Sequence, residues 1–130
     1  MIKKVTAIFF TVFLLITMAS CGSPEPEAPD ADYATVRDAA LAIKNGIDIT
    51  GKTIAVTMPE DSAAGAIYFA PDTSVGANLY VTIITDDNNR EEVLGLKKGS
   101  TVVVTVDAFD NHLVQSIYIF AKKYTIYDKK

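Results

Sequence analysis

The sequence predicts a small, mainly β domain of five to six strands with one short N-terminal helix, preceded by a signal peptide and a flexible tether. Helical spacing of apolar residues occurs once, near the start of the domain, and short apolar alternations separated by turn residues follow it. We therefore divide the 130 residues into a signal peptide at 1–20, a tether at 21–32 and one domain at 33–130.

The N-terminus has the pattern of a secretory signal. Lys3 and Lys4 precede an uncharged apolar run at 5–18, and the small residues Ala19 and Ser20 follow it. A run of about 14 apolar residues suits a signal core and falls short of the ~20 residues that a membrane-spanning helix requires. We therefore expect an export signal that is removed, not an anchor helix.

The run Met18-Ala19-Ser20-Cys21 resembles the lipobox of bacterial lipoproteins, with methionine where leucine is usual. The resemblance implies that Cys21 becomes the mature N-terminus and carries a diacylglycerol on its sulfur and a further acyl chain on its amine. Two or three acyl chains hold a protein on a membrane. Gly22 resembles the outer-membrane sorting class, so we expect a lipid anchor in the bacterial cell envelope, on the outer membrane if the organism has one. Cys21 is the only cysteine, so no intrachain disulfide and no catalytic thiol are expected.

The segment 22–32 contains three prolines and four acidic residues and nothing bulky, which predicts an extended tether. The whole chain has 12 basic and 16 acidic residues; removal of Lys3 and Lys4 with the signal leaves 10 against 16, a formal net charge of −6. An acidic domain is poorly suited to binding phosphates, because nucleic-acid affinity comes largely from lysine and arginine.

One helix is predicted at the start of the domain, capped by Asp30 or Asp32 and ended by Asn45-Gly46. Its apolar positions recur at helical spacing: Tyr33, Val36, Ala40 and Ile43.

Strands are then predicted from period-two alternation and from turn residues. The expected ranges are 53–58, 66–70 ended by Pro71, 79–83, 101–107, and 115–121 with a continuation toward residue 127 left open. In the last strand the alternation sends Ile117 and Ile119 inward and sends three aromatic side chains outward: Tyr118, Phe120 and Tyr124.

Three motifs carry a family resemblance: Thr-Gly-Lys-Thr-Ile-Ala-Val at 50–56, Leu-Tyr-Val-Thr-Ile at 79–83, and Leu-Lys-Lys-Gly-Ser-Thr-Val-Val-Val at 96–104. They resemble the small bacterial lipoproteins with a tRNA-anticodon-binding-like (tRNA_anti-like) OB-fold domain. The resemblance covers most of residues 33–127 and implies an OB-type barrel of five to six strands. It implies nothing about whether exported members contact RNA.

An OB-fold ordinarily binds its ligand on the outer face of its second and third strands and the adjoining loops. By position, the candidate ligand face comprises Tyr68, Tyr80, Thr82 and Arg90, with Asp72, Thr73 and Asn78 in the loops beside them. Exposed aromatic rings can stack on bases or sugars. The alternative, which we favour for each tyrosine, is half-buried packing.

The outward Tyr118 and Phe120 leave two possibilities open. They form a partner-binding patch, or the N-terminal helix covers them while it buries its own apolar residues. We expect the helix to cover them.

No catalytic residue, metal or cofactor is expected. The acids and amide around His112 are explained by turn chemistry, and His112 is the only histidine, which removes paired-histidine zinc sites. Glu91 and Glu92 are neighbours in sequence, and on a strand they would point to opposite faces, so they would not act as a pair. No phosphate-binding glycine loop or nucleophile elbow is present.

Two functional hypotheses follow. The first is an exported, membrane-anchored lipoprotein with a non-catalytic OB-fold binding or structural domain, whose ligand is an unidentified envelope protein, peptide or glycan. The second is an exported OB-fold domain that binds single-stranded nucleic acid, for which Lys97-Lys98 and Lys122-Lys123 are the supporting basic pairs.

Overall fold

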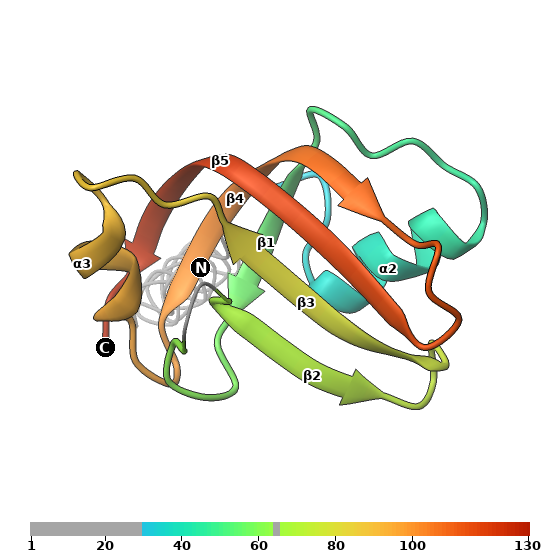
Figure 1. Cartoon of the computed structure of the whole chain (residues 1–130), viewed down its shortest axis with the longest axis horizontal. Coiled ribbons are helices and arrows are strands. Elements are labelled where there is room, and N and C mark those ends of the chain that lie inside the picture. Colours follow the sequence, from blue (N-terminus) through green and yellow to red (C-terminus); the bar gives the residue numbers. More distant parts are fainter. Residues whose placement is uncertain (1–29, 64–65) are drawn as a thin grey trace, which may run out of the picture.

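The structure, a computed structural model, describes residues 30–63 and 66–130. This part of the chain contains five strands and two short helices (Figure 1). In chain order they are α2 (Val36–Lys44), β1 (Thr53–Thr57), β2 (Tyr68–Asp72), β3 (Ala77–Ile83), α3 (Arg90–Leu94), β4 (Thr101–Asp110) and β5 (Ser116–Asp128). The predicted mainly β class and the N-terminal helix are confirmed. The predicted signal peptide, Cys21 and most of the predicted tether lie outside the described residues.

The five strands form one curled sheet in the order β1-β4-β5-β3-β2 (Figure 1). β3 and β5 run parallel, and the other neighbouring pairs run antiparallel. β1 and β2 are the two edges of the sheet, so the strands make a half-barrel that is open between them. Pro71 lies inside β2, where we had expected it to end the strand. An edge strand accommodates proline because the missing N–H can face away from the neighbouring strand.

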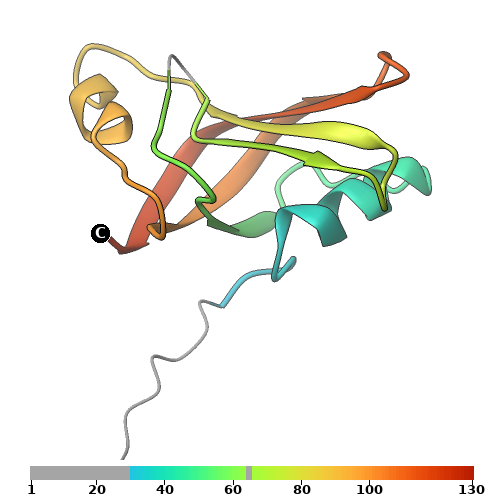
Figure 2. The ribbon, with the colours of Figure 1, turned by 90° about the horizontal axis from the view of Figure 1, so that it is seen from below.

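The core lies on the concave face of the sheet, where alternate residues are buried. β3 and β4 alternate buried and half-buried positions over most of their length, as the period-two pattern predicts. The helix α2 adds Val36, Ala39, Ala40 and Ile43 to the same apolar cluster. Figure 2 shows α2 on one side of β2 and β3, with the first described residues on that same side.

The N-terminus of α2 differs from the expectation. Thr35, not Asp30 or Asp32, caps the helix: its side chain accepts a hydrogen bond from the Asp38 N–H at 3.1 Å. Asp32 instead joins the edge strand β1, where its carboxylate accepts from the Thr53 N–H at 2.9 Å. The adjoining Tyr33 forms a parallel bridge with Ile54. The end of the predicted tether is therefore attached to the sheet.

The pairing of β4 with β5 contains irregularities that change which side chains face inward. Asp107 on β4 and Lys122 on β5 each lack a cross-strand partner in the register. Because one extra residue moves the following side chains to the other face, Tyr124 and Ile126 turn toward the core and pack against it. The expectation that Tyr124 points outward is therefore wrong. Its hydroxyl donates to the Glu92 carboxylate at 2.9 Å.

The second helix, α3, was missed in the sequence. It follows a turn in which the Asp86 side chain accepts from the N–H groups of Asn88 and Asn89. Only Val93 of α3 is buried, so the segment lacks the repeated apolar face by which a helix is recognised. None of the helices in the described part of the chain is long and apolar enough to cross a membrane.

Candidate ligand-binding face

Four aromatic rings form a continuous row on the convex face of β2, β3 and β5, which we call the aromatic strip: Phe69, Tyr80, Tyr118 and Phe120. Phe69 lies opposite Tyr80, and Tyr80 lies opposite Tyr118, in the strand register. The ring centroids are 4.8 Å apart for Phe69–Tyr80, 4.6 Å for Tyr80–Tyr118 and 6.4 Å for Tyr118–Phe120.

Strand alternation places these rings outside the core. Leu79 and Val81 flank Tyr80, Ile117 and Ile119 flank Tyr118, and all four are buried on the concave face. Since successive side chains point to opposite faces, the rings must point away from the core. The pairing of β2, β3 and β5 thus determines the positions of the rings on the convex face.

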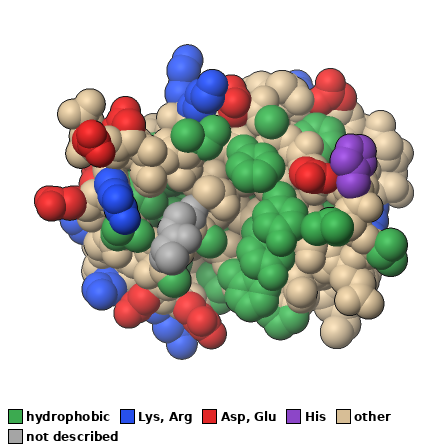
Figure 3. Space-filling view, in the orientation of Figure 1, with side chains coloured by type: hydrophobic (Ala, Val, Ile, Leu, Met, Phe, Trp, Pro, Cys, Tyr) green, Lys and Arg blue, Asp and Glu red, His purple; other side chains and the backbone are tan. Residues whose placement is uncertain are grey.

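The strip is accessible. Phe69 exposes 44% of its surface, and the other three rings are half-buried against one another. Figure 3 shows a continuous band of hydrophobic side chains across β5, β3 and β2, with lysine and arginine only toward the periphery of this view. Contiguous apolar surface of this kind is typical of an interaction site, whereas scattered apolar residues are not.

The packing of the rings limits what they can bind. Tyr80 has Phe69 on one side and Tyr118 on the other, and its ring is within 7° of parallel to that of Tyr118. These two ring neighbours hinder stacking of a base or a sugar on Tyr80, whereas Phe69 and Phe120 each have one ring neighbour. The strip presents ring edges and tyrosine hydroxyl groups, the kind of surface that suits a protein interface.

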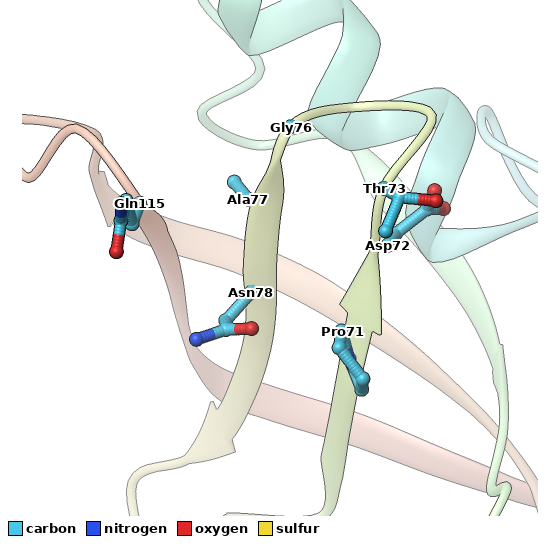
Figure 4. A pocket seen from close by; sticks show the side chains of 7 residues that line it. All are labelled: Pro71, Asp72, Thr73, Gly76, Ala77, Asn78 and Gln115. Atoms are coloured by element: carbon cyan, nitrogen blue, oxygen red, sulfur yellow. The ribbon is translucent and has the colours of Figure 1, made fainter.

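A hollow of about 320 Å³ adjoins the strip at the β2–β3 hairpin. It is lined by Pro71, Asp72, Thr73, Gly76, Ala77, Asn78 and Gln115. In Figure 4 Asn78 lies between Pro71 and Gln115, while the side chains of Asp72 and Thr73 point away from Asn78. The loop residues expected near the ligand face do lie at one hollow, but their polar groups do not converge on a common point.

The loop between β4 and β5 adds exposed apolar surface. Leu113 is 55% exposed and Val114 is 86% exposed. They precede Gln115, whose carbonyl accepts from the Asn78 N–H at 2.8 Å, so the loop is next to the hairpin hollow. These two residues were not singled out in the sequence, because a short apolar pair inside a turn has no periodicity.

Arg37 connects α2 to the β2–β3 hairpin. Its Nε donates to the Ser74 hydroxyl at 2.9 Å and lies 3.8 Å from the Asp72 carboxylate. The Ser74 hydroxyl and backbone N–H both donate to Asp72, and with Arg37 they lower the pKa of that carboxyl. This cluster uses its charges internally, so it positions the hairpin and leaves no free cation for a ligand.

The structure separates the residues of the predicted face. Tyr80 and Thr82 lie on the convex face, and Thr82 is opposite Phe120. Tyr68 lies opposite the buried Val81 and packs against the core, so it does not share the outer face, and the half-buried packing that we favour for it is confirmed. Burial raises the pKa of its hydroxyl. Phe69, one residue later, occupies the place we expected for Tyr68.

Arg90 is the first residue of α3, exposed, at the end of the sheet where β3 terminates (Figure 1). Arg90 follows a run of turn-forming residues, and for that reason we expected it in a loop beside the strand face. The structure places it on α3 instead.

The expectation that α2 covers Tyr118 and Phe120 is also wrong. The helix packs in the apolar cluster that contains Ile117 and Ile119, which is the opposite face of β5. Tyr118 and Phe120 are covered only in part, by their neighbours in the strip.

Of the two basic pairs, Lys122-Lys123 follows the strip ring Phe120 on β5, and Lys97-Lys98 lies in the loop before β4. Lys97 forms an ion pair with Asp61 at 3.7 Å, and Lys122 forms one with Asp107 at 3.7 Å. The backbone N–H of Lys98 donates to the same Asp61 carboxylate, which lowers its pKa. Acidic neighbours therefore offset much of the positive charge on which a nucleic-acid site would depend.

Within residues 30–63 and 66–130, no cluster of acidic, histidine or cysteine side chains could hold a metal ion. Asp110 accepts a hydrogen bond from the His112 N–H at 2.9 Å, the local bond of an aspartate at a turn.

No family model, curated protein or solved structure matches this chain. The function is therefore inferred from the geometry and the charge of the face.

Proposed function

We propose that this protein is an exported lipoprotein, anchored to the bacterial envelope through Cys21, whose non-catalytic OB-type domain binds a protein or peptide partner through the aromatic strip. The supports for the anchor are the apolar leader and the lipobox-like run. The supports for the OB-type assignment are the five-stranded, half-open sheet with β3 parallel to β5, and the three motifs that resemble this class.

One observation carries the binding proposal: an accessible aromatic strip on a face of the sheet that no element of the described chain covers. Exposed aromatic rings are characteristic of the centres of protein interfaces. The ring neighbours on both sides of Tyr80 disfavour stacking of bases or sugars at the middle of the strip, and the acidic charge of the domain disfavours phosphate. A polypeptide partner is the class that these features leave.

Site-specific crosslinking in intact cells tests the proposal. A photoreactive amino acid replaces Thr82, which is on the convex face beside Phe120, and in a matched control it replaces Thr125, which is exposed on β5 away from the strip. We expect a discrete protein adduct from position 82 and none from position 125. The added variant Tyr118→Ala should abolish the adduct.

An adduct that contains oligonucleotide instead of protein would favour the nucleic-acid hypothesis. Equal adducts from both positions, or an adduct indifferent to Tyr118→Ala, would remove the strip as the binding face.

A further inference from the structure

The cross-strand row Phe69–Tyr80–Tyr118 within the aromatic strip has an acidic residue beyond each of its ends. Asp110 on β4 lies opposite Tyr118, and it extends the row Phe69–Tyr80–Tyr118 by one strand. At the other end, Phe69 lines a hollow of about 110 Å³ together with Glu60 and Asp61. No lysine or arginine lines this hollow or stands in the row. Both ends of this row therefore have a carboxylate, whereas Phe120, the fourth ring of the strip, lies opposite Ala108.

Two of these carboxylates are available to a ligand. Asp61 is engaged by Lys97 and by the Lys98 N–H. Asp110 accepts only the His112 N–H, and neither Asp110 nor Glu60 forms an ion pair within the described part of the chain. A half-buried carboxylate such as Asp110, next to aromatic rings, gains more from an added cation than a fully solvated one.

The row has a length that an extended polypeptide can match. Four neighbouring strands, β2, β3, β5 and β4, contribute Phe69, Tyr80, Tyr118 and Asp110, which at ~4.8 Å per strand spans about 14 Å. About four extended residues cover that distance. The aliphatic stems of lysine and arginine also pack on aromatic edges while their charged groups reach a carboxylate.

The position and the charge of the strip disfavour the protein's own tether as its occupant. The described chain begins on the α2 side of the sheet, and the strip is on the opposite face (Figure 2). The acidic residues of the tether are repelled by the same carboxylates that attract a cation.

We infer that the row Phe69–Tyr80–Tyr118 of the aromatic strip, with Asp110 and Glu60 at its two ends, binds a cationic, extended segment of another polypeptide, in which a lysine or arginine stands within about four residues of aliphatic side chains. This inference rests on the proposed function, and it specifies the chemistry of the partner. Charge complementarity selects the segment, and ring edges supply the apolar contact.

Direct binding tests it. The full acylated protein in zwitterionic micelles is titrated against a fluorescent peptide of lysine, valine and serine, about twelve residues long, which exceeds the row at ~3.3 Å per residue. Two matched peptides replace every lysine by serine or by glutamate, and empty micelles serve as the blank. We expect only the lysine peptide to bind tightly, with affinity falling as salt rises.

Isosteric variants locate the charge effect. Asp110→Asn, which keeps the acceptor for His112, and Glu60→Gln should each weaken the lysine peptide about threefold to tenfold and flatten its salt dependence. Glu91→Gln, which removes the same charge from α3, should change neither. Equal binding of the glutamate peptide, or unchanged binding by both strip variants, overturns the inference.

The two proposals fail separately. If the serine and lysine peptides bind equally and Tyr80→Ala weakens both, the strip remains a polypeptide site and the cationic preference is lost. If crosslinking from position 82 yields no protein in cells, the proposed function itself fails.

Discussion

Tyr80 and Tyr118 stack face to face across the one parallel strand pair of the sheet, with centroids 4.6 Å apart and ring planes within 7°. Parallel pairing is slightly weaker per residue than antiparallel pairing. The ring contact reinforces β3 and β5 at the middle of their register, so the aromatic strip contributes to stability as well as to the surface.

A double-mutant cycle measures that contribution. Tyr80→Ala and Tyr118→Ala should each lower the free energy of unfolding, and their coupling energy should be about 0.5–1.5 kcal/mol, the usual value for an aromatic pair. Urea denaturation followed by circular dichroism gives the four values. Tyr80→Ala combined with Thr125→Ala, which is not its neighbour, should be additive within about 0.5 kcal/mol. Additivity of the Tyr80 and Tyr118 changes would contradict a real ring contact.

Removal of the helix cap should destabilise α2 and, through its core residues, the whole domain. Thr35→Ala deletes the hydroxyl that accepts the Asp38 N–H, and caps of this type contribute about 1 kcal/mol. Thr35→Ser keeps the oxygen and should retain most of the stability. Denaturant midpoints check both variants, and equal stability of the alanine and serine variants would show that the cap is not formed.

Acid should destabilise the fold through carboxylates that accept backbone hydrogen bonds. The Thr53 N–H lowers the pKa of Asp32, and the Lys98 N–H lowers the pKa of Asp61. A folded-state pKa below the unfolded value of about 3.9 gives stability that is present above that value and is lost as pH falls through the folded pKa.

Thermal unfolding from pH 6 to pH 2.5 tests this sign. The Tm should fall steeply below about pH 4. Asp32→Asn should have a lower Tm at pH 6 and a shallower fall, whereas Thr125→Ser, which removes no titratable group, should follow the parent curve. A Tm that rises on acidification would contradict the lowered folded-state pKa values of these carboxyls.

Deletion of Lys122 tests the irregular pairing of β5. The extra residue sets Tyr124 and Ile126 toward the core, so its removal turns both side chains outward. We expect a loss of more than about 2 kcal/mol, comparable to removing a large apolar side chain from a core. Deletion of Lys129, beyond the end of β5, removes the same side chain and should have little effect on the denaturant midpoint.

The anchor has its own test. Cys21→Ser should abolish incorporation of a palmitate analogue and move the protein from the detergent phase to the aqueous phase, because several acyl chains are needed for stable attachment. Labelling that persists in this variant would place the lipid elsewhere. The variant should not change the denaturant midpoint of the domain.

Period-two patterns predicted the strands well wherever one face is buried. The alternation of Leu79, Val81 and Ile83 with half-buried residues was read correctly, as was the inward direction of Ile117 and Ile119. The predicted direction of individual side chains differs from the structure at two positions, and each difference has a physical cause. Tyr68 is a positional candidate for the outer face, but Phe69 takes that place, because the register of β2 depends on its pairing with β3. Tyr124 was assigned outward because one unpaired residue inverts the facing, and no composition signal marks it.

Only part of the aromatic strip could be predicted from the sequence. Tyr80, Tyr118 and Phe120 were each noticed, but their assembly requires that β3 pair with β5 and not with β4, which is adjacent in sequence. Such a parallel, non-local pairing is decided by the whole sheet. The position of Asp110 beside the row also depends on strand pairing, since Asp110 lies opposite Tyr118 only through the β4–β5 register.

The contact of the entering chain with β1 also has a mechanical consequence. Tyr33 exchanges backbone hydrogen bonds with β1, donating to the Thr53 carbonyl at 3.0 Å and accepting from the Ala55 N–H at 2.9 Å, beside the Asp32–Thr53 bonds. A force applied through the N-terminal side of the chain meets these few bonds before it reaches the core. They act together, so tension on the N-terminal side must break them before it can pull an edge strand away from the sheet.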